Sequence, residues 1–244
     1  MLTLLTDPAF CDSSELRVEG DSYRHLFSAR RLEVGEELRI VDGRGRARWG
    51  KVARVDRPSA PVTLAGPAPE REPAFRLDLI VPTCRPERAS WLVEKATEVG
   101  VHAVRFVNMA RAPRELGAGT MDRLCRVAEA AVEQSHRCRL PEVTGPHSWS
   151  EVGRLAEGAG ARWFLDPEAA PGWGGDVRGE GERGALLVGP EGGLDPGERR
   201  ELLAAGWQPA GLGDRILRLE TAALVGASFL LLIPPGKRDS DFRN

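Results

Sequence analysis

Glycine-rich loops are the residues of this sequence whose types and spacing point most clearly to chemistry. Residues 187–194 read LVGPEGGL, so an apolar run leads directly into three glycines and a proline. Glycine lets the backbone adopt positive φ and come close to a ligand, and ligands of parallel sheets bind at such loops. A second loop follows at 212–221. Either loop alone could equally be a tight turn, but together they predict a pocket lined largely by backbone atoms.

Other common catalytic motifs do not fit. Residues 179–184 match G-x-G-x-x-G, but they precede an apolar strand, whereas a dinucleotide-binding loop follows one. No P-loop and no G-x-S-x-G nucleophile motif occurs, and the four histidines lie far apart. The four cysteines show no C-x-x-C spacing. We therefore expect neither a P-loop nucleotidase nor a serine hydrolase, and no metal.

The charges are distributed unevenly along the chain. The net charge is −2, with 34 cationic residues, of which only Lys51, Lys95 and Lys237 are lysines. A GC-rich genome would explain the excess of arginine, but not its position. Residues 24–57 hold ten cationic and five acidic side chains, whereas residues 151–201 hold eleven acidic and six cationic ones. This asymmetry predicts that the N-terminal part meets an anionic macromolecule.

The chain that positions these loops is expected to divide into two domains near residue 70. Five prolines between residues 57 and 73 argue against a helix or a central strand and predict a domain junction. Before the junction, short apolar runs at 37–41 and 48–55 flank Asp42-Gly43, a dipeptide typical of hairpins. Residues 1–70 are therefore expected to form a small β-barrel.

After the junction, strands and helices alternate. Strands are expected at 76–81, 103–107, 161–165 and 185–188. Helices are expected at 86–99, 121–135 and 195–206, and two more are expected to begin after Ser148 and at Glu220. Thr120 is expected to cap the helix at 121–135. Such alternation predicts a parallel sheet with helices on both faces. The expected fold class is α/β, with a small barrel at 1–70 and a larger domain at 71–244.

The amino terminus and the hydropathy predict a cytoplasmic protein. Asp7 and Pro8 interrupt the first residues before a signal-peptide core can form. The longest apolar stretch, residues 222–233, is shorter than the roughly 18–20 residues that span a bilayer. We therefore expect no membrane segment.

The two loops are part of a longer pattern that resembles a known family. Three motifs carry the resemblance: VGPEGG at 188–193, LG at 212–213 and RILRLETAA at 215–223. They are similar to the signature of the RsmE family, the small-subunit ribosomal RNA uracil N3-methyltransferases of the SPOUT superfamily. WLVEKATEVG at 91–100 and the region around His25 extend the resemblance over nearly the whole chain. Residues 85–88 depart from the family's lysine-and-glycine turn.

The resemblance implies a fold, a cofactor and partners. The fold would be a PUA-like β-barrel followed by a SPOUT methyltransferase domain whose C-terminal segment threads a trefoil knot, in a homodimer. The cofactor would be S-adenosylmethionine, and the substrate would be 16S rRNA or the small ribosomal subunit. The residues that it places at the cofactor are Leu165, Val188, Gly189, Pro190, Glu191, Gly192, Leu212, Gly213, Ile216, Leu217 and Arg218.

The implied reaction suggests two catalytic residues. Uracil N3 carries a proton at neutral pH, so Arg218 is the best candidate for stabilising the charge on O2 and O4 when that proton leaves. Glu220 is a weaker candidate base, because a carboxylate at a helix N-terminus is also favoured by the helix dipole. RNA contacts are expected from arginines, any of which could also be a solvated surface residue: Arg24, Arg31, Arg46, Arg48, Arg111 and Arg137.

Two other functions stay open at this point. A non-catalytic RNA-binding protein could keep the same fold, although degenerate cofactor loops would be expected there and both loops are intact. A SPOUT enzyme acting on a transfer RNA ribose or guanine is the second, and the N-terminal barrel and the RILRLET run argue against it.

Overall fold

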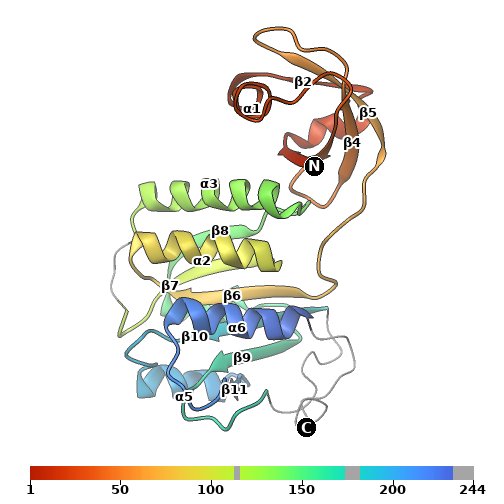
Figure 1. The fold of residues 1–244 in the computed structure, drawn as a ribbon. Coiled ribbons are helices and arrows are strands. Elements are labelled where there is room, and N and C mark those ends of the chain that lie inside the picture. Colours follow the sequence, from red (N-terminus) through yellow and green to blue (C-terminus); the bar gives the residue numbers. More distant parts are fainter. Residues whose placement is uncertain (113–115, 174–181, 233–244) are drawn as a thin grey trace. The chain divides into compact units, whose positions relative to one another are not determined.

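The computed structural model describes residues 1–112, 116–173 and 182–232 (Figure 1). Part of the acidic loop predicted at 179–184 therefore lies outside the described residues. The chain divides into two compact units, one of Met1–Glu72 with Glu129–Leu140, the other of Pro73–Ala128 with Pro141–Asn244. Each unit has its own sheet, and each is described separately below.

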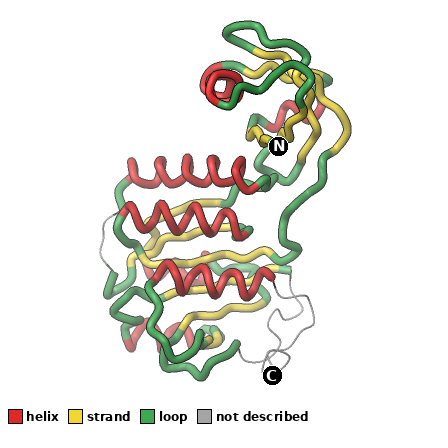
Figure 2. The backbone as a smooth tube through the Cα atoms, viewed as in Figure 1, coloured by secondary structure: helices red, strands yellow, loops and turns green. Residues whose placement is uncertain are grey.

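The first unit is built on a five-stranded sheet with the order β1-β3-β4-β5-β2. Figure 2 shows strands in yellow and helices in red. The strands are β1 Leu2–Leu5, β2 Glu15–Val18, β3 Glu37–Val41, β4 Ala47–Val52 and β5 Ala60–Pro67. Short helical turns occupy Pro8–Asp12, Gly20–Tyr23 (α1) and Arg24–Ala29. The sheet is curled, as expected of a PUA-like domain, and its alternating residues Leu38, Ile40 and Val62 form a core with Leu26.

The expectation that residues 57–73 hold no central strand is wrong. Strand β5 pairs with β4 on one side and with β2 on the other. Its prolines are tolerated because Pro61 lies near the start of the strand and Pro67 lies at its end, beyond an irregularity in the pairing with β4. Proline is accepted at such positions, where the ladder does not need its missing N–H.

Residues 129–140 complete the first unit from far along the sequence. Val132 and Cys138 pack against Val41 and Ala47. The carboxylate of Glu133 accepts a hydrogen bond of 2.9 Å from the backbone N–H of Leu5. The packing of the first unit therefore includes a segment that a boundary at residue 70 assigns to the other domain.

The second unit contains a six-stranded sheet with the order β11-β9-β10-β6-β7-β8. Its strands are β6 Arg76–Pro82, β7 Ala103–Asn108, β8 Glu142–Ser148, β9 Ala161–Leu165, β10 Arg183–Val188 and β11 Gln208–Ala210. All five pairings are parallel, as predicted. The helices are α2 Pro86–Val99, α3 Ala118–Ser135, α4 Val152–Leu155, α5 Pro196–Ala204 and α6 Leu219–Leu232.

Helices cover both faces of this sheet, as the alternation of elements predicted (Figure 1). On one face Ile80, Phe164 and Leu187 pack with residues of α4 and α5. On the other face α6 approaches β10 so closely that a Cβ at Gly226 would lie 2.8 Å from Leu186 Cδ2. Successive residues of a strand point to opposite faces, and apolar residues on both are needed to hold two helical layers.

Local signals fix most helix ends. Pro86 starts α2, and Gly100 ends it with φ of 103°, where a Cβ would lie 2.5 Å from Pro73. The prediction that Thr120 caps the next helix is wrong. The N–H of Met121 already donates to the carbonyl of Gly117, so α3 begins at Ala118 and includes Thr120.

Among the described residues, no helix combines the length and the apolar character that crossing a bilayer requires.

Candidate cofactor pocket and active site

Three adjacent parallel strands bring the predicted loops to one edge of the sheet. Leu165 at the end of β9 pairs with Val188 at the end of β10 and with Ala210 at the end of β11. The glycine loop, residues 189–195, and the second loop, residues 211–218, therefore leave the sheet from neighbouring positions. This edge is where open α/β sheets bind ligands.

The glycine loop is a tight turn that leads into α5. The N–H of Gly193 donates to the carbonyl of Pro190 at 2.8 Å, and Gly193 has φ of 72°. A Cβ at Gly189 would lie 3.1 Å from Leu194 Cγ, so a side chain there must displace its neighbour or enter the pocket. Asp195 then caps α5 by accepting from the N–H of Gly197 at 2.8 Å. Glu191 and Gly192 are exposed at the tip.

The second loop is held by backbone hydrogen bonds that only glycine permits. Gly211 and Gly172 exchange N–H to carbonyl hydrogen bonds of 3.1 and 3.0 Å. A Cβ at Gly211 would lie 2.6 Å from the carbonyl oxygens of Ala169 and Ala170. Gly213 then turns the chain with φ of 95°. This close packing of backbone on backbone fits a site that recognises its ligand through main-chain groups.

The remaining predicted residues of this loop differ in exposure. Leu212 and Leu217 are half-buried, whereas the side chain of Ile216 is 96% exposed, so a cofactor contact of Ile216 would use its backbone. Arg218 is exposed, and its carbonyl accepts the first hydrogen bond of α6 from the N–H of Ala222 at 2.8 Å. Arg218 is therefore accessible to solvent at the start of α6, where its charge also acts on Glu220.

Arg88 links the glycine loop to the first turn of α6, a contact that sequence reasoning missed. This residue lies in the first turn of α2, and its Nη2 is 2.7 Å from Glu191 Oε1 and 2.6 Å from Glu220 Oε2. Its Nε donates to Glu220 Oε2 at 3.2 Å. No sequence pattern signals ion pairs between residues more than a hundred positions apart.

The contacts of Glu220 argue against its predicted role as a base. Burial raises the pKa of this carboxyl group, but hydrogen bonds from Arg88 and from the backbone, with the charges of Arg88 and Arg218, outweigh burial and lower the pKa below its ordinary value. A carboxylate with a lowered pKa is a weak proton acceptor. The alternative interpretation, a stabilising carboxylate in the first turn of a helix, fits these contacts better.

Arg111, predicted to bind RNA, is attached to the glycine loop. It follows β7, and its Nη1 donates to the carbonyl of Gly192 at 2.8 Å. The buried carboxylate of Glu198 supports the same junction by accepting from the N–H groups of Ala110 at 2.8 Å and Asp195 at 2.9 Å. Arg111 therefore shapes the pocket rim, while its side chain stays partly exposed.

The predicted arginines of the first unit are not equivalent. Arg24 is exposed and pairs with Asp21, and Arg31 is exposed with φ of 56°. Arg48 donates to the carbonyls of Ala65 and Ser13 at 2.9 and 2.8 Å.

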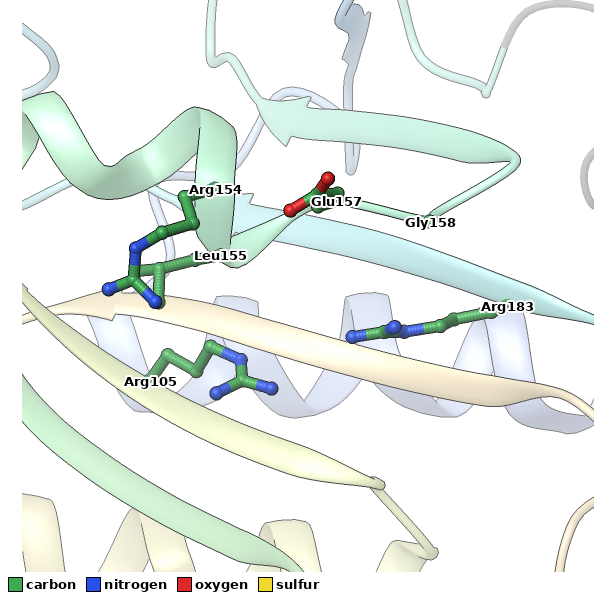
Figure 3. A pocket seen from close by; sticks show the side chains of 6 residues that line it. All are labelled: Arg105, Arg154, Leu155, Glu157, Gly158 and Arg183. Atoms are coloured by element: carbon green, nitrogen blue, oxygen red, sulfur yellow. The ribbon is translucent and has the colours of Figure 1, made fainter.

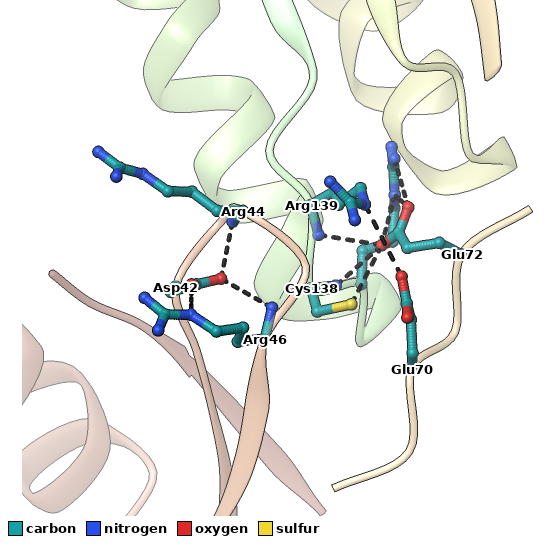
Figure 4. A network of polar contacts seen from close by, with 8 residues as sticks. Asp42, Arg44, Arg46, Glu70, Glu72, Cys138 and Arg139 are labelled. Carbon is teal, nitrogen blue, oxygen red and sulfur yellow. Dashed lines mark hydrogen bonds and ion pairs between the residues drawn. The ribbon is translucent and has the colours of Figure 1, made fainter. Parts of the chain in front are cut away.

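Arg46 is one of the residues that donate hydrogen bonds to the carboxylate of Asp42 in the β3–β4 hairpin (Figure 4). Its Nε donates to Asp42 Oδ2 at 2.8 Å, while Asp42 Oδ1 accepts from the N–H groups of Arg44 and Arg46. Burial raises the pKa of Asp42, but these hydrogen bonds outweigh burial and lower it. The hairpin thus holds Arg46 in place with its side chain 55% exposed, which leaves it accessible to RNA.

Arg137 is placed differently from the other arginines, because its side chain is only 4% exposed. Its Nη2 lies 2.7 Å from Glu72 Oε2, and the other oxygen of Glu72 accepts from the N–H groups of Cys138 and Arg139 at 2.9 and 3.0 Å (Figure 4). A guanidinium with this burial is directed to a carboxylate inside the first unit, a position that favours a structural role over the predicted contact with RNA.

Replacing Arg137 by alanine is expected to lower the free energy of unfolding by about 3–5 kcal/mol, because the change leaves the buried Glu72 carboxylate without its cation. Chemical denaturation of the full chain measures this loss. Arg44→Ala, on the same unit but exposed, is the control and should change stability by less than about 0.5 kcal/mol. A loss below about 1 kcal/mol for Arg137→Ala would return this arginine to the candidate RNA contacts.

A separate hollow of about 500 Å³ lies near the amino ends of the strands and is lined by Arg105, Arg154 and Arg183 (Figure 3). Each of these three arginines forms an ion pair with a carboxylate of the same unit. Arg105 and Arg183 lie 3.5 and 2.5 Å from the buried Asp78, and Arg154 lies 2.6 Å from Glu151. This hollow is distinct from the glycine loops and shows no excess of positive charge.

The described parts of the chain contain no group of three or more His, Cys, Asp or Glu side chains that could hold a metal ion.

Comparisons with known proteins match this architecture along most of the chain. Residues 70–231 match the RNA methyltransferase domain family, and residues 18–64 match the PUA domain of RNA methyltransferases. Ribosomal RNA small subunit methyltransferase E of Mycobacterium bovis is 33% identical over 219 residues, which cover 85% of this chain and 82% of that protein.

Solved structures share the fold. Ribosomal RNA small subunit methyltransferase E from Neisseria gonorrhoeae, bound to S-adenosyl methionine, superposes with a TM-score of 0.84 at 24% identity and covers 94% of this chain and 96% of its own. A probable rRNA-methyltransferase from Porphyromonas gingivalis has a TM-score of 0.78 at 28% identity, with 100% of both chains covered.

Proposed function

The chain belongs to the family of ribosomal RNA small subunit methyltransferase E, and from that premise we propose that it transfers the methyl group of S-adenosylmethionine to N3 of a uridine in 16S rRNA. The observation that carries the proposal is the common edge of β9, β10 and β11, from which both the glycine loop and the second loop, with Arg218 at its end, leave the sheet. Family membership supports the class of reaction, and this edge supports the choice of the residues that would perform it.

The two loops fit the cofactor by their shape. Gly189 and Gly211 occupy positions where a Cβ would meet neighbouring atoms at 3.1 and 2.6 Å, so both loops follow a backbone path that a larger residue would disturb. The M. bovis and N. gonorrhoeae relatives are methyltransferases by name, and the latter is bound to S-adenosyl methionine. The sulfonium of this cofactor supplies an activated methyl group, so the protein's task is to bind, orient and exclude water.

Arg218 supplies the electrostatic part of the mechanism. Uracil becomes anionic at O2 and O4 when N3 loses its proton, and a fixed guanidinium beside these oxygens stabilises the charge as it develops. Arg218 is suited to this role because it is exposed at the rim, while its backbone is anchored at the start of α6. Glu220 forms an ion pair with Arg88, so its role would be to hold the start of α6 in place and not to transfer a proton.

The first unit would hold the RNA, and the second would form a knot and a dimer. From β10 the chain crosses to β11, which lies on the far side of β9. It then returns as α6, which packs on β10 and β6. A C-terminal segment that threads a knot would have to follow such a return path. Helices α2 and α6 pack together and leave Trp91 and Val225 44% and 45% exposed, which gives a second copy an apolar surface to cover.

The proposal predicts the modification state of 16S rRNA in a strain that lacks the gene. Nucleoside mass spectrometry and primer extension should show loss of one 3-methyluridine, which the wild-type gene restores. The Arg218→Ala gene should restore little of it, although the protein accumulates normally. An unchanged level of 3-methyluridine in the deletion strain would refute the proposed substrate.

A further inference from the structure

One guanidinium connects the glycine loop of the proposed cofactor pocket to the start of α6, which follows the second loop. Arg88 Nη2 lies within 2.7 Å of Glu191 Oε1, at the tip of the glycine loop, and within 2.6 Å of Glu220 Oε2, in the first turn of α6. The hydrogen bond from Nε to Glu220 at 3.2 Å directs the planar group toward α6. A single side chain therefore contacts both segments that border the pocket.

The base of this connection is rigid. Pro86 fixes the first turn of α2, and the N–H of Ala89 donates to the carbonyl of Arg85 at 3.0 Å. Ala89 and Leu92 are fully buried, and α2 packs along α6. The Arg88 backbone is thus fixed to the body of the second unit, and its guanidinium is a firm anchor for the two carboxylates that it contacts.

The two contacts differ in strength. The side chains of Arg88 and Glu220 are 28% and 15% exposed, so their pair is shielded from water. Glu191 is 62% exposed, and its contact is screened in the way of a surface ion pair. The contact with α6 is therefore the stronger of the two, and the contact with the glycine loop is the weaker.

We propose that Arg88 is a positioning residue of the methyltransferase, which holds the glycine loop against the start of α6 so that cofactor and Arg218 meet in one geometry. The inference rests on the function proposed above. Without Arg88, the tip of the glycine loop loses its link to α6, and the cofactor must order that loop when it binds. Affinity for S-adenosylmethionine then falls, and so does the rate, because misplacement of reacting groups slows transfer.

A double-mutant cycle on Arg88 and Glu191 tests the link. Calorimetry should show that Arg88→Ala weakens S-adenosylmethionine binding by about tenfold, within the range found for coupled contacts. Glu191→Gln should cause a smaller loss, and the double variant should bind no more weakly than Arg88→Ala alone. Arg154→Ala, which removes an ion pair at the other edge of the sheet, is the matched control and should bind as the wild type does.

The titration of Glu220 separates positioning from a general loss of stability. Two cations, Arg88 and Arg218, act on this carboxylate. Its pKa, followed by NMR, should rise toward the ordinary value in Arg88→Ala and stay low in Glu191→Gln. Arg88→Lys should restore part of the affinity, since it keeps the charge without the planar fork. If the Arg88→Ala protein does not fold, Arg88→Lys and Glu191→Gln provide the test instead. The inference would then be overturned if neither variant bound S-adenosylmethionine more weakly than the wild type.

Two further results would overturn the inference in distinguishable ways. A folded Arg88→Ala protein with unchanged affinity, or losses that simply add in the double variant, would overturn the role of Arg88 while the wild-type enzyme remains active. A wild-type protein that neither binds S-adenosylmethionine nor methylates 16S rRNA would overturn the proposed function and the inference together.

Discussion

Replacing Arg218 by alanine is expected to lower the single-turnover rate of methylation by about 10²–10³-fold, the usual effect of losing one donor to a developing oxyanion. The physical reason is that neutral uracil becomes anionic along the reaction path. The guanidinium therefore interacts more strongly with the transition state than with the bound substrate. Dissociation constants for RNA and S-adenosylmethionine should change by less than about tenfold.

The pH dependence of the Arg218→Ala rate gives a second readout. The optimum should move to higher pH, where uracil loses its N3 proton without help. Arg218→Lys should recover only part of the rate, because an ammonium is a point charge and lacks the planar fork. A normal single-turnover rate combined with weak RNA binding would show that Arg218 is a phosphate contact instead.

Replacing Gly189 by valine is expected to abolish detectable binding of S-adenosylmethionine while the fold is kept. A Cβ at this position would lie 3.1 Å from Leu194 Cγ, so the branched side chain must occupy the space beside the glycine loop. The neighbour that it meets is a side chain and can shift, which is why the fold should survive. Calorimetry with the cofactor, together with a thermal melt, measures both properties.

Gly153→Val is the matched control for this substitution. Gly153 lies in α4, and no atom lies within 4 Å of the Cβ that would be added there. Its cofactor affinity should equal that of the wild type. If the folded Gly189→Val protein bound S-adenosylmethionine normally, the glycine loop would not form the wall of the cofactor pocket.

Elements governed by local signals could be predicted from the sequence. The strands at 37–41 and 161–165 have the predicted bounds, because their apolar runs end at turn residues. The helix from Pro86 ends at Gly100, as the proline and the glycine indicated. The meeting of the glycine loop and the second loop followed from parallel strands whose carboxyl ends share one edge.

Features that depend on distant partners could not be predicted. Strand β5 is central despite its prolines, because tertiary pairing places Pro61 and Pro67 where no ladder N–H is needed. Arg137 resembles a surface arginine in sequence, but it is buried because Glu72 lies opposite. The sequence around Arg88 indicates only a departure from the family pattern, since the partners of Arg88 are more than a hundred residues away.

The most direct test of the account is to follow the methyl group itself. Purified protein is incubated with S-adenosylmethionine that carries an isotope-labelled methyl group and with 16S rRNA or small subunits from the deletion strain. The RNA is then digested, and its nucleosides are identified by mass spectrometry. The account predicts one labelled product, 3-methyluridine, at a single position of 16S rRNA. Label in a ribose or a guanine, or no label while the RNA is bound, would contradict it.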